Sequence, residues 1–374
     1  MGSISVLIVG GGPAGSSCAW ALRQAGFDPL ILDKRSFPRD KICGGWITPA
    51  VLGELHIDPA EYSQSHVCQP ITGFRTSSMG RAEVETLYSE PISFGIRRFE
   101  FDDYLLRRSG ARIAPGVALK SLEKSGADWI VNGQYKADVV VGAGGHFCPV
   151  ARFLNGDLEK VPAVVAQEIE FQMDLRQRDA CSIQPEVPEL FFCADMKGYG
   201  WCFRKGDFLN IGLGRLDSHA LPTHVSDFAR FLRRTGKIGF DLPPSFPGHA
   251  YLLYANTRRR IASDGILLIG DAAGLAYSQS GEGIRPAVES GLLAAKAIIA
   301  SAGRFDRNSI ETYRASLESR FGKSGEDWST RIGRRLPPKL RNSLAAALLG
   351  SHWFSRHFVL DRWFLHRHEP ALSF

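Results

Sequence analysis

The chain lacks several features that would assign it to a narrow class. Its seven cysteines form no CxxC pair, which argues against a thiolate zinc site and a thioredoxin-type redox pair. No apolar run approaches the roughly 18 residues that cross a bilayer, and no targeting segment precedes the first apolar run at Ile4. The ten histidines show no ligand spacing, so we expect no metal. These absences favour a cytoplasmic protein in a reducing compartment.

The composition itself is ordinary for a globular enzyme. The 374 residues are 44% hydrophobic and 22% charged, which allows one large core or two modest ones. Glycine is frequent, at 39 residues, as in folds where backbones approach each other closely. There is no internal repeat and no low-complexity linker. Motifs must therefore carry the functional information.

The strongest positive feature is a glycine motif between two apolar runs. Gly10, Gly12 and Gly15 follow the apolar run 4–9, and Asp33 closes a second apolar run 18 positions after Gly15. Strand, glycine turn, helix, strand and acid in this order form the fingerprint of a dinucleotide-binding unit. The glycines allow a tight turn and a close approach to a pyrophosphate, and the helix N-terminus offers unpaired N–H groups to it.

A second signal favours a flavin dinucleotide over NAD. Gly270 and Asp271 follow the late apolar run 266–269, and an aspartate there can accept hydrogen bonds from ribityl hydroxyls. Gly281-Glu282-Gly283 then open a predicted helix over about 284–301. The N–H groups at its start suit the pyrimidine edge of a flavin and the negative charge of the reduced ring. An NAD dehydrogenase needs no such second half, so we expect FAD.

The remaining patterns predict the fold class. We expect an α/β (α+β) chain with a Rossmann-like FAD-binding domain, an inserted antiparallel β-sheet domain for the substrate, and a helical C-terminal tail. Alternating apolar runs between residues 161 and 256 predict the inserted sheet. The expected division assigns residues 1–50, 96–160 and 257–305 to the FAD-binding domain, 51–95 and 161–256 to the substrate domain, and 306–374 to a helical basic C-terminal region.

Three further stretches resemble one family. Residues 41–45, Lys-Ile-Cys-Gly-Gly, with Thr48-Pro49 form a K-x-C-G-G-x-x-[ST]-P loop. Residues 198–205 are similar to a Y-x-W-x-F-P-K segment, and residues 270–274 with 281–284 to G-D-A-A-G…G-E-G-I. Together they resemble the FAD-dependent geranylgeranyl reductase family, within the p-hydroxybenzoate hydroxylase-like flavoproteins. The likeness covers about residues 1–300.

The resemblance implies a role for each matching residue. Cys43 would face the flavin ring where the substrate docks, and Tyr199 and Trp201 would line a hydrophobic tunnel. These three are the catalytic candidates. On general grounds Cys43 is equally a packing residue, and residues such as Tyr199 and Trp201 are more often part of a core. Glu282 either tunes the ring or caps the helix that follows it. The residues implied at FAD are Gly10, Gly12, Pro13, Ala14, Gly15, Asp33, Lys34, Gly44, Gly45, Arg98, Asp271, Gly281, Gly283 and Ile284.

The chain also departs from the family pattern. Gly144 stands where relatives have an aspartate in a G-A-D-G turn, which argues against tight NADPH binding. Arg204 replaces the proline before Lys205, and residues 277–280 lack the proline common before the G-E-G turn. These departures describe an off-centre member whose substrate need not be a polyprenyl lipid.

The implied activity is an FAD-dependent reduction. Reduced flavin N5 would pass a hydride to a carbon–carbon double bond of a hydrophobic, isoprenoid-like substrate, and Cys43 or water would supply the proton. The external electron donor would be NAD(P)H or a reduced protein. One alternative is a class A-type flavin monooxygenase acting on a small or aromatic substrate. An alternative of another class is a non-catalytic FAD-binding redox sensor.

The basic C-terminal region suggests a further contact. Eight lysines or arginines and four histidines lie between residues 331 and 368, with Asp361 as the one acid and five aromatics interleaved. Such a segment can lie on an anionic membrane surface, or it can pack its aromatics on the protein. Both interpretations stay open, and a membrane-associated location is an alternative to a purely cytoplasmic one. The rest of the chain carries no nucleic-acid-binding motif, so no nucleic acid partner is expected.

Overall fold

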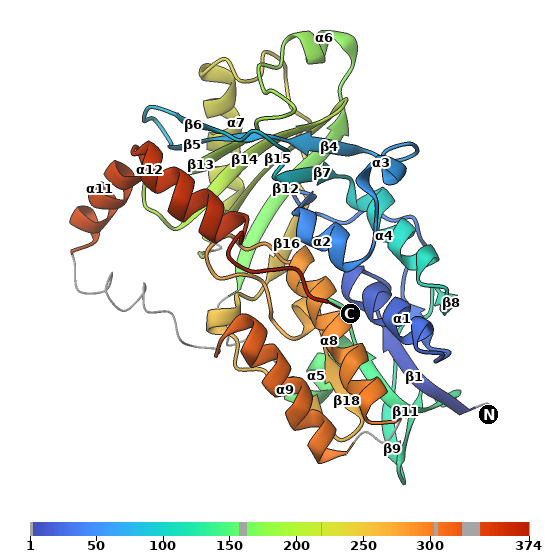
Figure 1. The fold of residues 1–374 in the computed structure, drawn as a ribbon. Coiled ribbons are helices and arrows are strands. Elements are labelled where there is room, and N and C mark those ends of the chain that lie inside the picture. The colour runs from blue at the N-terminus through green and yellow to red at the C-terminus, as the bar shows by residue number, and fades with distance from the viewer. Residues whose placement is uncertain (1–2, 157–162, 218, 303–305, 324–336, 374) are drawn as a thin grey trace.

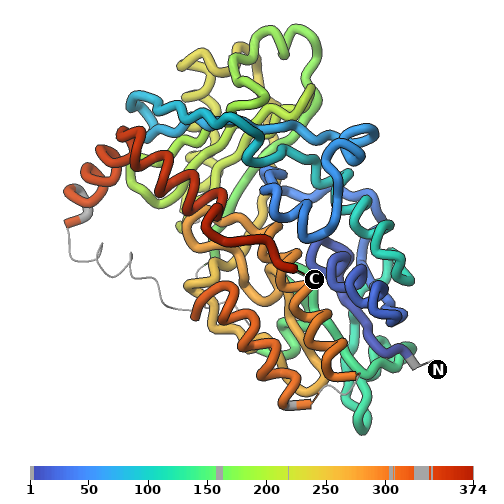
Figure 2. The backbone as a smooth tube through the Cα atoms, viewed as in Figure 1, coloured from blue at the N-terminus to red at the C-terminus, as the bar shows by residue number. Residues whose placement is uncertain are grey.

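The computed structural model describes residues 3–156, 163–217, 219–302, 306–323 and 337–373 (Figure 1). Two large sheets form separate layers. One carries the dinucleotide motif, and the other lies at the opposite end of the molecule, with the C-terminal helices along its side (Figure 2). Among the described residues, no helix combines the length and the hydrophobicity that crossing a membrane requires.

The first sheet has eight strands and positions the dinucleotide motif. Its main path runs β17-β18-β11-β1-β2-β8, with β10 on β11 and β9 on β10. β1 pairs in parallel with β2 and with β11, so that Val9 lies opposite Leu32 and Gly142 and the carboxyl ends of the three strands share one edge. The strands are β1 (Ser3–Val9), β2 (Leu30–Asp33), β8 (Arg112–Pro115), β9 (Leu122–Ser125), β10 (Asp128–Val131), β11 (Tyr135–Gly142), β17 (Ala262–Ser263) and β18 (Ile266–Leu268).

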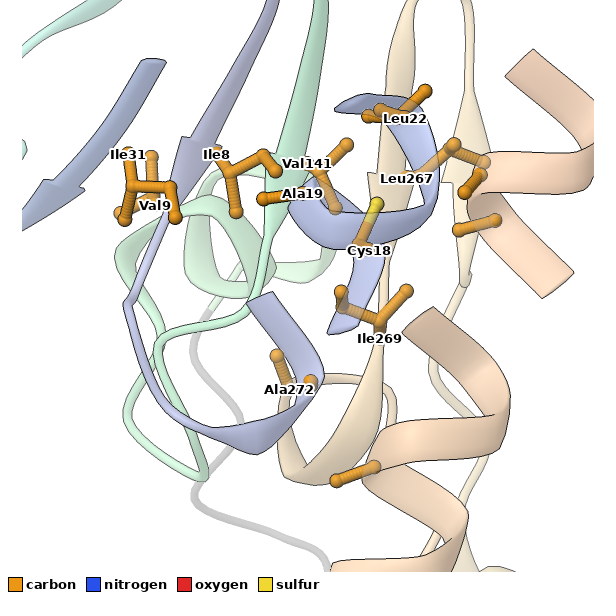
Figure 3. Close-up of a cluster of buried hydrophobic side chains, with 14 of the residues drawn as sticks. Ile8, Val9, Cys18, Ala19, Leu22, Ile31, Val141, Leu267, Ile269 and Ala272 are labelled. Atoms are coloured by element: carbon orange, nitrogen blue, oxygen red, sulfur yellow. The ribbon is translucent and has the colours of Figure 1, made fainter. Parts of the chain in front are cut away.

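Helices cover this sheet, and small residues let two of them meet closely. A Cβ atom at Gly291 would overlap the carbonyl oxygen of Ala14, so α1 and α8 approach at backbone distance. Figure 3 shows the buried core that they share with the strands, including Ile8, Val141 and Leu267. The helices are α1 (Pro13–Gln24), α4 (Arg98–Arg108), α5 (Pro149–Asn155), α8 (Ile284–Ala300) and α9 (Arg307–Phe321).

The second sheet has seven strands in the order β16-β12-β15-β14-β13-β5-β6. Helix α7 (Leu221–Arg234) packs Phe228 and Leu232 into the core on one face, with α6 (Leu175–Asp179) nearby. A three-stranded sheet β3-β7-β4 joins the two halves. These strands are β3 (Trp46–Ile47), β4 (Cys68–Ile71), β5 (Gly73–Ser78), β6 (Val84–Leu87), β7 (Ser93–Ile96), β12 (Val164–Gln172), β13 (Glu189–Phe192), β14 (Gly198–Lys205), β15 (Phe208–Arg215) and β16 (Gly248–Tyr251).

The expected fold class is confirmed, with two refinements. The second sheet, which the sequence assigns to the substrate domain, is antiparallel except where β13 pairs in parallel with β5, a strand that precedes it by about a hundred residues. The alternation of apolar and polar residues could not predict this parallel pair, because it indicates which face of a strand is buried and not the direction in which the strand runs. The second refinement is that two short helices, α2 (Pro49–Glu54) and α3 (Pro59–Tyr62), precede strand β4. The domain boundaries themselves stay a prediction.

The C-terminal region divides between the two halves of the molecule. In α9, Tyr313 is buried and donates a hydrogen bond to the carbonyl oxygen of Leu268, 2.8 Å away, in the first sheet. Helix α11 (Pro338–Leu349), the short α12 (His352–Phe354) and a π-helical segment, η3 (Ser355–Phe364), instead run along the second sheet (Figure 1). Phe364 and Leu360 are buried there. The expected helical C-terminal region is confirmed, and tertiary packing places its helices against both large sheets. The described residues also contain two short 3-10 segments, η1 (Tyr254–Asn256) and η2 (Gly270–Ala272).

Candidate flavin and substrate site

A cavity of about 1060 Å³ lies between the two large sheets. Its walls come from the carboxyl edge of the first sheet, the loop 39–46, one face of the second sheet and the turn 280–284. Phe364 reaches it from the C-terminal segment. One cavity thus joins the dinucleotide motif to the aromatic part of the substrate sheet.

The glycine turn leaves room for a phosphate against the backbone. Gly10 has a φ of +115°, and its N–H donates to the carbonyl oxygen of Leu32 over 2.8 Å. A Cβ at Gly10 would overlap the carbonyl of Ala143, and one at Gly15 would overlap the carbonyl of Gly10. Helix α1 has no side-chain cap at Gly12, so its first N–H groups remain available to an anion. These features fit the pyrophosphate of FAD.

Asp33 ends β2 and is held by two backbone donors. Gly11 N donates to one carboxylate oxygen over 2.8 Å, and Arg35 N donates to the other over 2.9 Å. Asp33 lines the cavity next to Lys34. The carboxylate therefore has a defined orientation and an edge on the cavity, as a ribose-binding acid requires.

Arg98 places a fixed positive charge in the cavity wall. Its Nε and Nη2 atoms lie 2.6 and 2.8 Å from the two carboxylate oxygens of Asp102, which is fully buried. Burial lowers the pKa of the guanidinium, but the effect of Asp102 and Cys43, which raise it, is larger. The pKa of Arg98 is therefore above its ordinary value. Arg39 also approaches Asp102, at 3.4 Å. Two arginines thus share one carboxylate, which leaves a net positive charge suited to phosphate.

Lys41 and His249 form a second polar pair on the cavity. The Nζ atom of Lys41 lies 3.1 Å from each ring nitrogen of His249. Burial lowers the pKa of His249 to about 3, helped by the charges of Lys41 and Arg98, so the imidazole is neutral near pH 7. Asp271 lies 3.9 Å from His249 Nε2. Three segments far apart in the sequence therefore meet where the expected ribityl–pyrophosphate link would lie.

The turn before α8 has the geometry expected beside a flavin ring. Gly281 has a φ of +70°, and a Cβ there would overlap the hydroxyl of Tyr251. Glu282 Oε1 accepts a hydrogen bond from Arg285 N over 2.7 Å, which caps the start of α8. Of the two roles considered for Glu282, this contact favours capping. Gly283 and Ile284 line the cavity beside it.

The substrate sheet presents an aromatic wall to the cavity. Trp201 Nε1 donates to Asn210 Oδ1 over 2.8 Å, and Tyr199 donates to the carbonyl of Ser280. Their ring centroids are 5.9 Å apart, and Phe364 approaches Tyr199 at 5.3 Å. The indole N–H of Trp201 and the hydroxyl of Tyr199 are therefore both hydrogen-bonded, and the two aromatic rings line the cavity.

The structure brings nearly all of the expected site residues together. All the residues implied at FAD line the cavity except Gly15, which lies behind the turn where helix and strand touch. The three catalytic candidates Cys43, Tyr199 and Trp201 line it too. Their individual roles stay predictions. The cavity is also lined by residues to which the sequence had given no role, among them Arg39, Lys41, Glu168, His249, Tyr251 and Phe364.

Most of these additional residues carry no local signal. His249 and Tyr251 lie on a four-residue strand, and Glu168 lies in an alternating run in which it looks like a solvent-facing charge. Lys41 alone had a signal, because it opens the K-x-C-G-G loop. Sequence spacing did not predict that strand β12 turns Glu168 toward the cavity.

One group of possible metal ligands occurs among the described residues. His366, His368 and Glu369 place their ligand atoms within 4.8 Å of one another, although the histidine spacing had not suggested a metal. The carboxylate of Glu369 already accepts a hydrogen bond from Tyr277 over 3.0 Å, and Arg320 lies 4.0 Å away. The expectation of no metal site stays a prediction.

Comparison with known proteins agrees with this geometry. Residues 8–63 match the model of an NAD(P)-binding Rossmann-like domain. A menaquinone reductase of Mycobacterium tuberculosis is 30% identical over 319 residues, which are 79% of this chain and 76% of that protein. Digeranylgeranylglycerophospholipid reductase 3 of Methanosphaera stadtmanae is 28% identical over 86% of this chain and 84% of its own.

A solved structure shares the whole fold. A geranylgeranyl bacteriochlorophyll reductase-like protein of Thermoplasma acidophilum superposes with a TM-score of 0.77, at 19% identity, over 98% of both chains. The Rossmann-like edge, its glycine turn and the cavity between the sheets therefore define an FAD-dependent oxidoreductase. The chain belongs to the FAD-dependent geranylgeranyl reductase family.

Proposed function

We propose that this protein uses FAD to reduce carbon–carbon double bonds in the isoprenoid chain of a lipid or quinone. The observation that carries the proposal is the single cavity, which runs from the dinucleotide turn to the aromatic wall formed by Trp201, Tyr199 and Phe364. The relatives support it, because one is named a menaquinone reductase and another a digeranylgeranylglycerophospholipid reductase. Menaquinone and digeranylgeranyl lipids both carry isoprenoid chains.

Different residues of the chain suit different parts of FAD and of the substrate. FAD, when bound and reduced, supplies a hydride. The N-terminus of α1 and the cations Arg98 and Lys41 suit its phosphates, and Asp33 suits its ribose. Trp201 and Phe364 exclude water from the far end of the cavity. Exclusion of water lets an apolar chain enter and keeps the reduced site from side reactions.

The test is an anaerobic single-turnover reaction. The FAD-loaded enzyme, reduced with dithionite, is mixed with menaquinone or with a geranylgeranyl lipid, and the product is analysed by mass spectrometry. We expect the flavin to reoxidise and one lipid to gain two hydrogens. An oxygenated product formed in air from a small aromatic compound would instead support the monooxygenase alternative. A flavin that no lipid reoxidises would support the redox sensor.

The electron donor is a second part of the proposal. Gly144 places no carboxylate at the turn where relatives carry aspartate, and a Cβ there would lie 3.2 Å from Cys148 Sγ. We propose that a reduced protein, and not NADPH, reduces the flavin. In an anaerobic titration, a reduced ferredoxin-type donor should bleach the flavin faster than NADPH or NADH. Rapid reduction by a nicotinamide at micromolar concentration would contradict this.

Peripheral membrane contact is the third part. Leu340, Leu344 and Leu348 repeat every four residues on α11 and are 56%, 50% and 40% exposed, and Trp353 just beyond is 61% exposed. Figure 1 shows α11 at the periphery of the molecule. An apolar stripe within a basic segment fits an anionic lipid surface, where a lipid substrate resides.

Vesicle sedimentation tests this contact. We expect the protein to sediment with vesicles that contain anionic lipid and to lose binding when Leu344 and Leu348 are both replaced by Glu. Leu175→Glu is the matched control, because Leu175 is a 70% exposed leucine on α6, which lies on a different part of the molecule. Equal sedimentation of both variants would exclude α11 as the contact.

A further inference from the structure

Glu168 is a carboxyl group on the cavity that binding of FAD does not require. It lies on β12, opposite Gly212 of β15. A Cβ at Gly212 would lie 2.6 Å from the Cβ of Glu168 and would overlap the ring of Trp201. Glu168 and Trp201 therefore flank the bare backbone of Gly212 on one face of the sheet. That face is the aromatic wall at which the substrate is expected.

The hydrogen bonds of Glu168 leave one oxygen for the cavity. Its Oε1 accepts from the backbone N–H of Cys43, and its side chain is 5% exposed. Within the part of the chain that the structure describes, Oε2 accepts no hydrogen bond, and it is not among the buried atoms that lack a partner. The carboxyl group is thus held through one oxygen, while the other borders the cavity.

A second carboxylate on the same strand is bound quite differently. Glu170 accepts hydrogen bonds from Lys205 over 2.7 Å and from Arg97 over 3.1 Å. These cations lower the pKa of Glu170 despite its burial. Burial raises the pKa of Glu168 to about 7. The charge of Lys205, which is hydrogen-bonded to Glu170 and not to Glu168, offsets this rise only in part. Neighbouring carboxyl groups with pKa values pushed apart are a feature of acid–base sites.

We propose that Glu168 donates the proton that completes reduction of the substrate double bond. This inference rests on the proposed function. A hydride carries two electrons to one alkene carbon, so the second carbon needs one proton. The hydride forms one C–H bond with its own electron pair, and the π electrons form the second C–H bond with the proton from Glu168 Oε2, whose O–H bond breaks. The reduced flavin is thereby oxidised, the alkene is reduced, and Glu168 is left as a carboxylate that regains its proton from solvent.

Two other groups on the cavity compete for this role. Glu282 is committed to capping α8 through Oε1, and its Oε2 is buried without a partner. The thiol of Cys43 lies beside the guanidinium of Arg98. All three groups line the cavity, and Glu168 differs from the other two because it lies beside Trp201 on the face of the second sheet while a backbone hydrogen bond holds it in place.

The groups that face Glu168 would shape its titration. They are Glu170 on its own strand, Lys205 from β14, Lys41 and the Cys43 N–H from the loop 41–45, and Tyr251 from β16. Removal of one of them should shift the titration without abolishing it. Removal of Glu168 itself should abolish it.

The test compares Glu168→Gln with Glu168→Asp in the FAD-loaded, dithionite-reduced enzyme. With the lipid that the wild type reduces, we expect Glu168→Gln to reoxidise its flavin about 100-fold more slowly, as for loss of a general acid, and to lose the pH dependence near neutrality. Glu168→Asp should restore part of the rate. Full activity of Glu168→Gln, or an equal loss of pH dependence in Cys43→Ser, would overturn the inference.

A second measurement needs no substrate. Burial also raises the pKa of Glu282 to about 7 and that of Glu54 to about 8, so infrared difference spectra of the FAD-loaded protein across pH 5–9 should contain several protonated-carboxyl components. One component that titrates near pH 7 should be missing from Glu168→Gln and retained in Glu282→Gln and Glu54→Gln. If this component is present but no isoprenoid is reduced by the wild type, the proposed function fails while the protonation state of Glu168 is established. If the component is absent from the wild type, the inference fails whatever the substrate.

Discussion

The two walls of the cavity are built in opposite ways. At the dinucleotide turn, the critical contacts are made by backbone, and Gly10 and Gly15 matter because a Cβ atom would not fit. At the aromatic wall, the cavity is lined by side chains such as Trp201, Glu168 and Phe364, which come from three separate segments. The sequence signal of the first wall lies within residues 10–33, although Gly10 also meets the backbone of Ala143, whereas the second wall has no such local signal.

The difference has a consequence for how each wall responds to substitution. A backbone cradle fails when volume is added, because neither neighbour can move away. A side-chain wall fails gradually when atoms are removed, since the surrounding groups retain their own hydrogen bonds. Substitutions at the two walls should therefore differ in size and in which step they affect.

The largest effect is expected at Gly15. In Gly15→Val, the new side chain would overlap the carbonyl of Gly10, so we expect a protein that loses FAD or fails to fold. The measurement is the flavin content of the purified protein by absorbance. Gly53→Ala is the control, because no atom lies within 4 Å of the Cβ position in α2, and it should keep its flavin. A yellow Gly15→Val protein would refute the backbone account.

The next effect tests a buried ion pair at the dinucleotide wall, between Arg98 and Asp102. Asp102→Asn leaves the buried Arg98 without its counter-charge and should lower the free energy of unfolding by about 3 kcal/mol. Urea unfolding of the FAD-loaded protein measures it. Asp103→Asn removes the neighbouring carboxylate, whose partner Arg107 is 70% exposed, and should change stability little. Equal losses in the two variants would contradict the argument.

A smaller, pH-dependent effect is expected where the C-terminal segment crosses between the two halves. Burial and the nearby Glu289 raise the pKa of Glu54 from 4.5 to about 8, and its Oε1 accepts from Leu372 N over 3.1 Å. Protonated Glu54 favours the fold, so its contribution is present below pH 4.5 and is lost as the pH rises through about 8.

Glu54→Gln tests this contribution directly. The amide keeps the Leu372 contact and stays neutral, so its melting temperature should exceed that of the wild type above pH 8, with the difference shrinking toward pH 5. Thermal unfolding followed by circular dichroism at pH 5, 7 and 9 measures it. A difference that does not change with pH would mean that Glu54 is ionised throughout.

The smallest effect is expected at the aromatic wall. Trp201→Phe removes the hydrogen bond to Asn210 and should raise the KM for the isoprenoid about fivefold, with FAD content unchanged. Trp129→Phe removes a similar hydrogen bond, to the carbonyl of Asp264 at 3.1 Å, in the first sheet. It should leave KM unchanged. A loss of FAD in Trp201→Phe would show that the two walls are not separable.

Sequence reasoning succeeded where function depends on local backbone geometry. The strand at residues 4–9, the helix behind it and the helix from Ile284 were all predicted within a few residues of β1, α1 and α8. Their signals are an apolar run, a glycine turn and a helix start, each contained in a short window. The cofactor followed from the same signals and is confirmed as FAD.

It fell short where distant segments meet. The parallel pair β13–β5, the pairing of Lys41 with His249 and the arrival of Phe364 at the cavity each join residues more than a hundred positions apart. The interleaved aromatics of the C-terminal region illustrate the limit, since one of them, Phe364, is buried at the cavity and another, Trp353, is exposed. Nothing in their local spacing separates the two.

The amino-acid sequence by itself determined the class of cofactor and predicted the place of its phosphates, because glycine turns and helix termini bind anions through nearby backbone groups. Only the tertiary structure decided which side chains line the other wall of the cavity. Strand pairing turned Glu168 and Trp201 to the same side of Gly212, and burial there raised the pKa of one carboxyl while two cations lowered that of Glu170. A side chain's charge and exposure depend on its neighbours in space, and the order of the chain does not specify those neighbours.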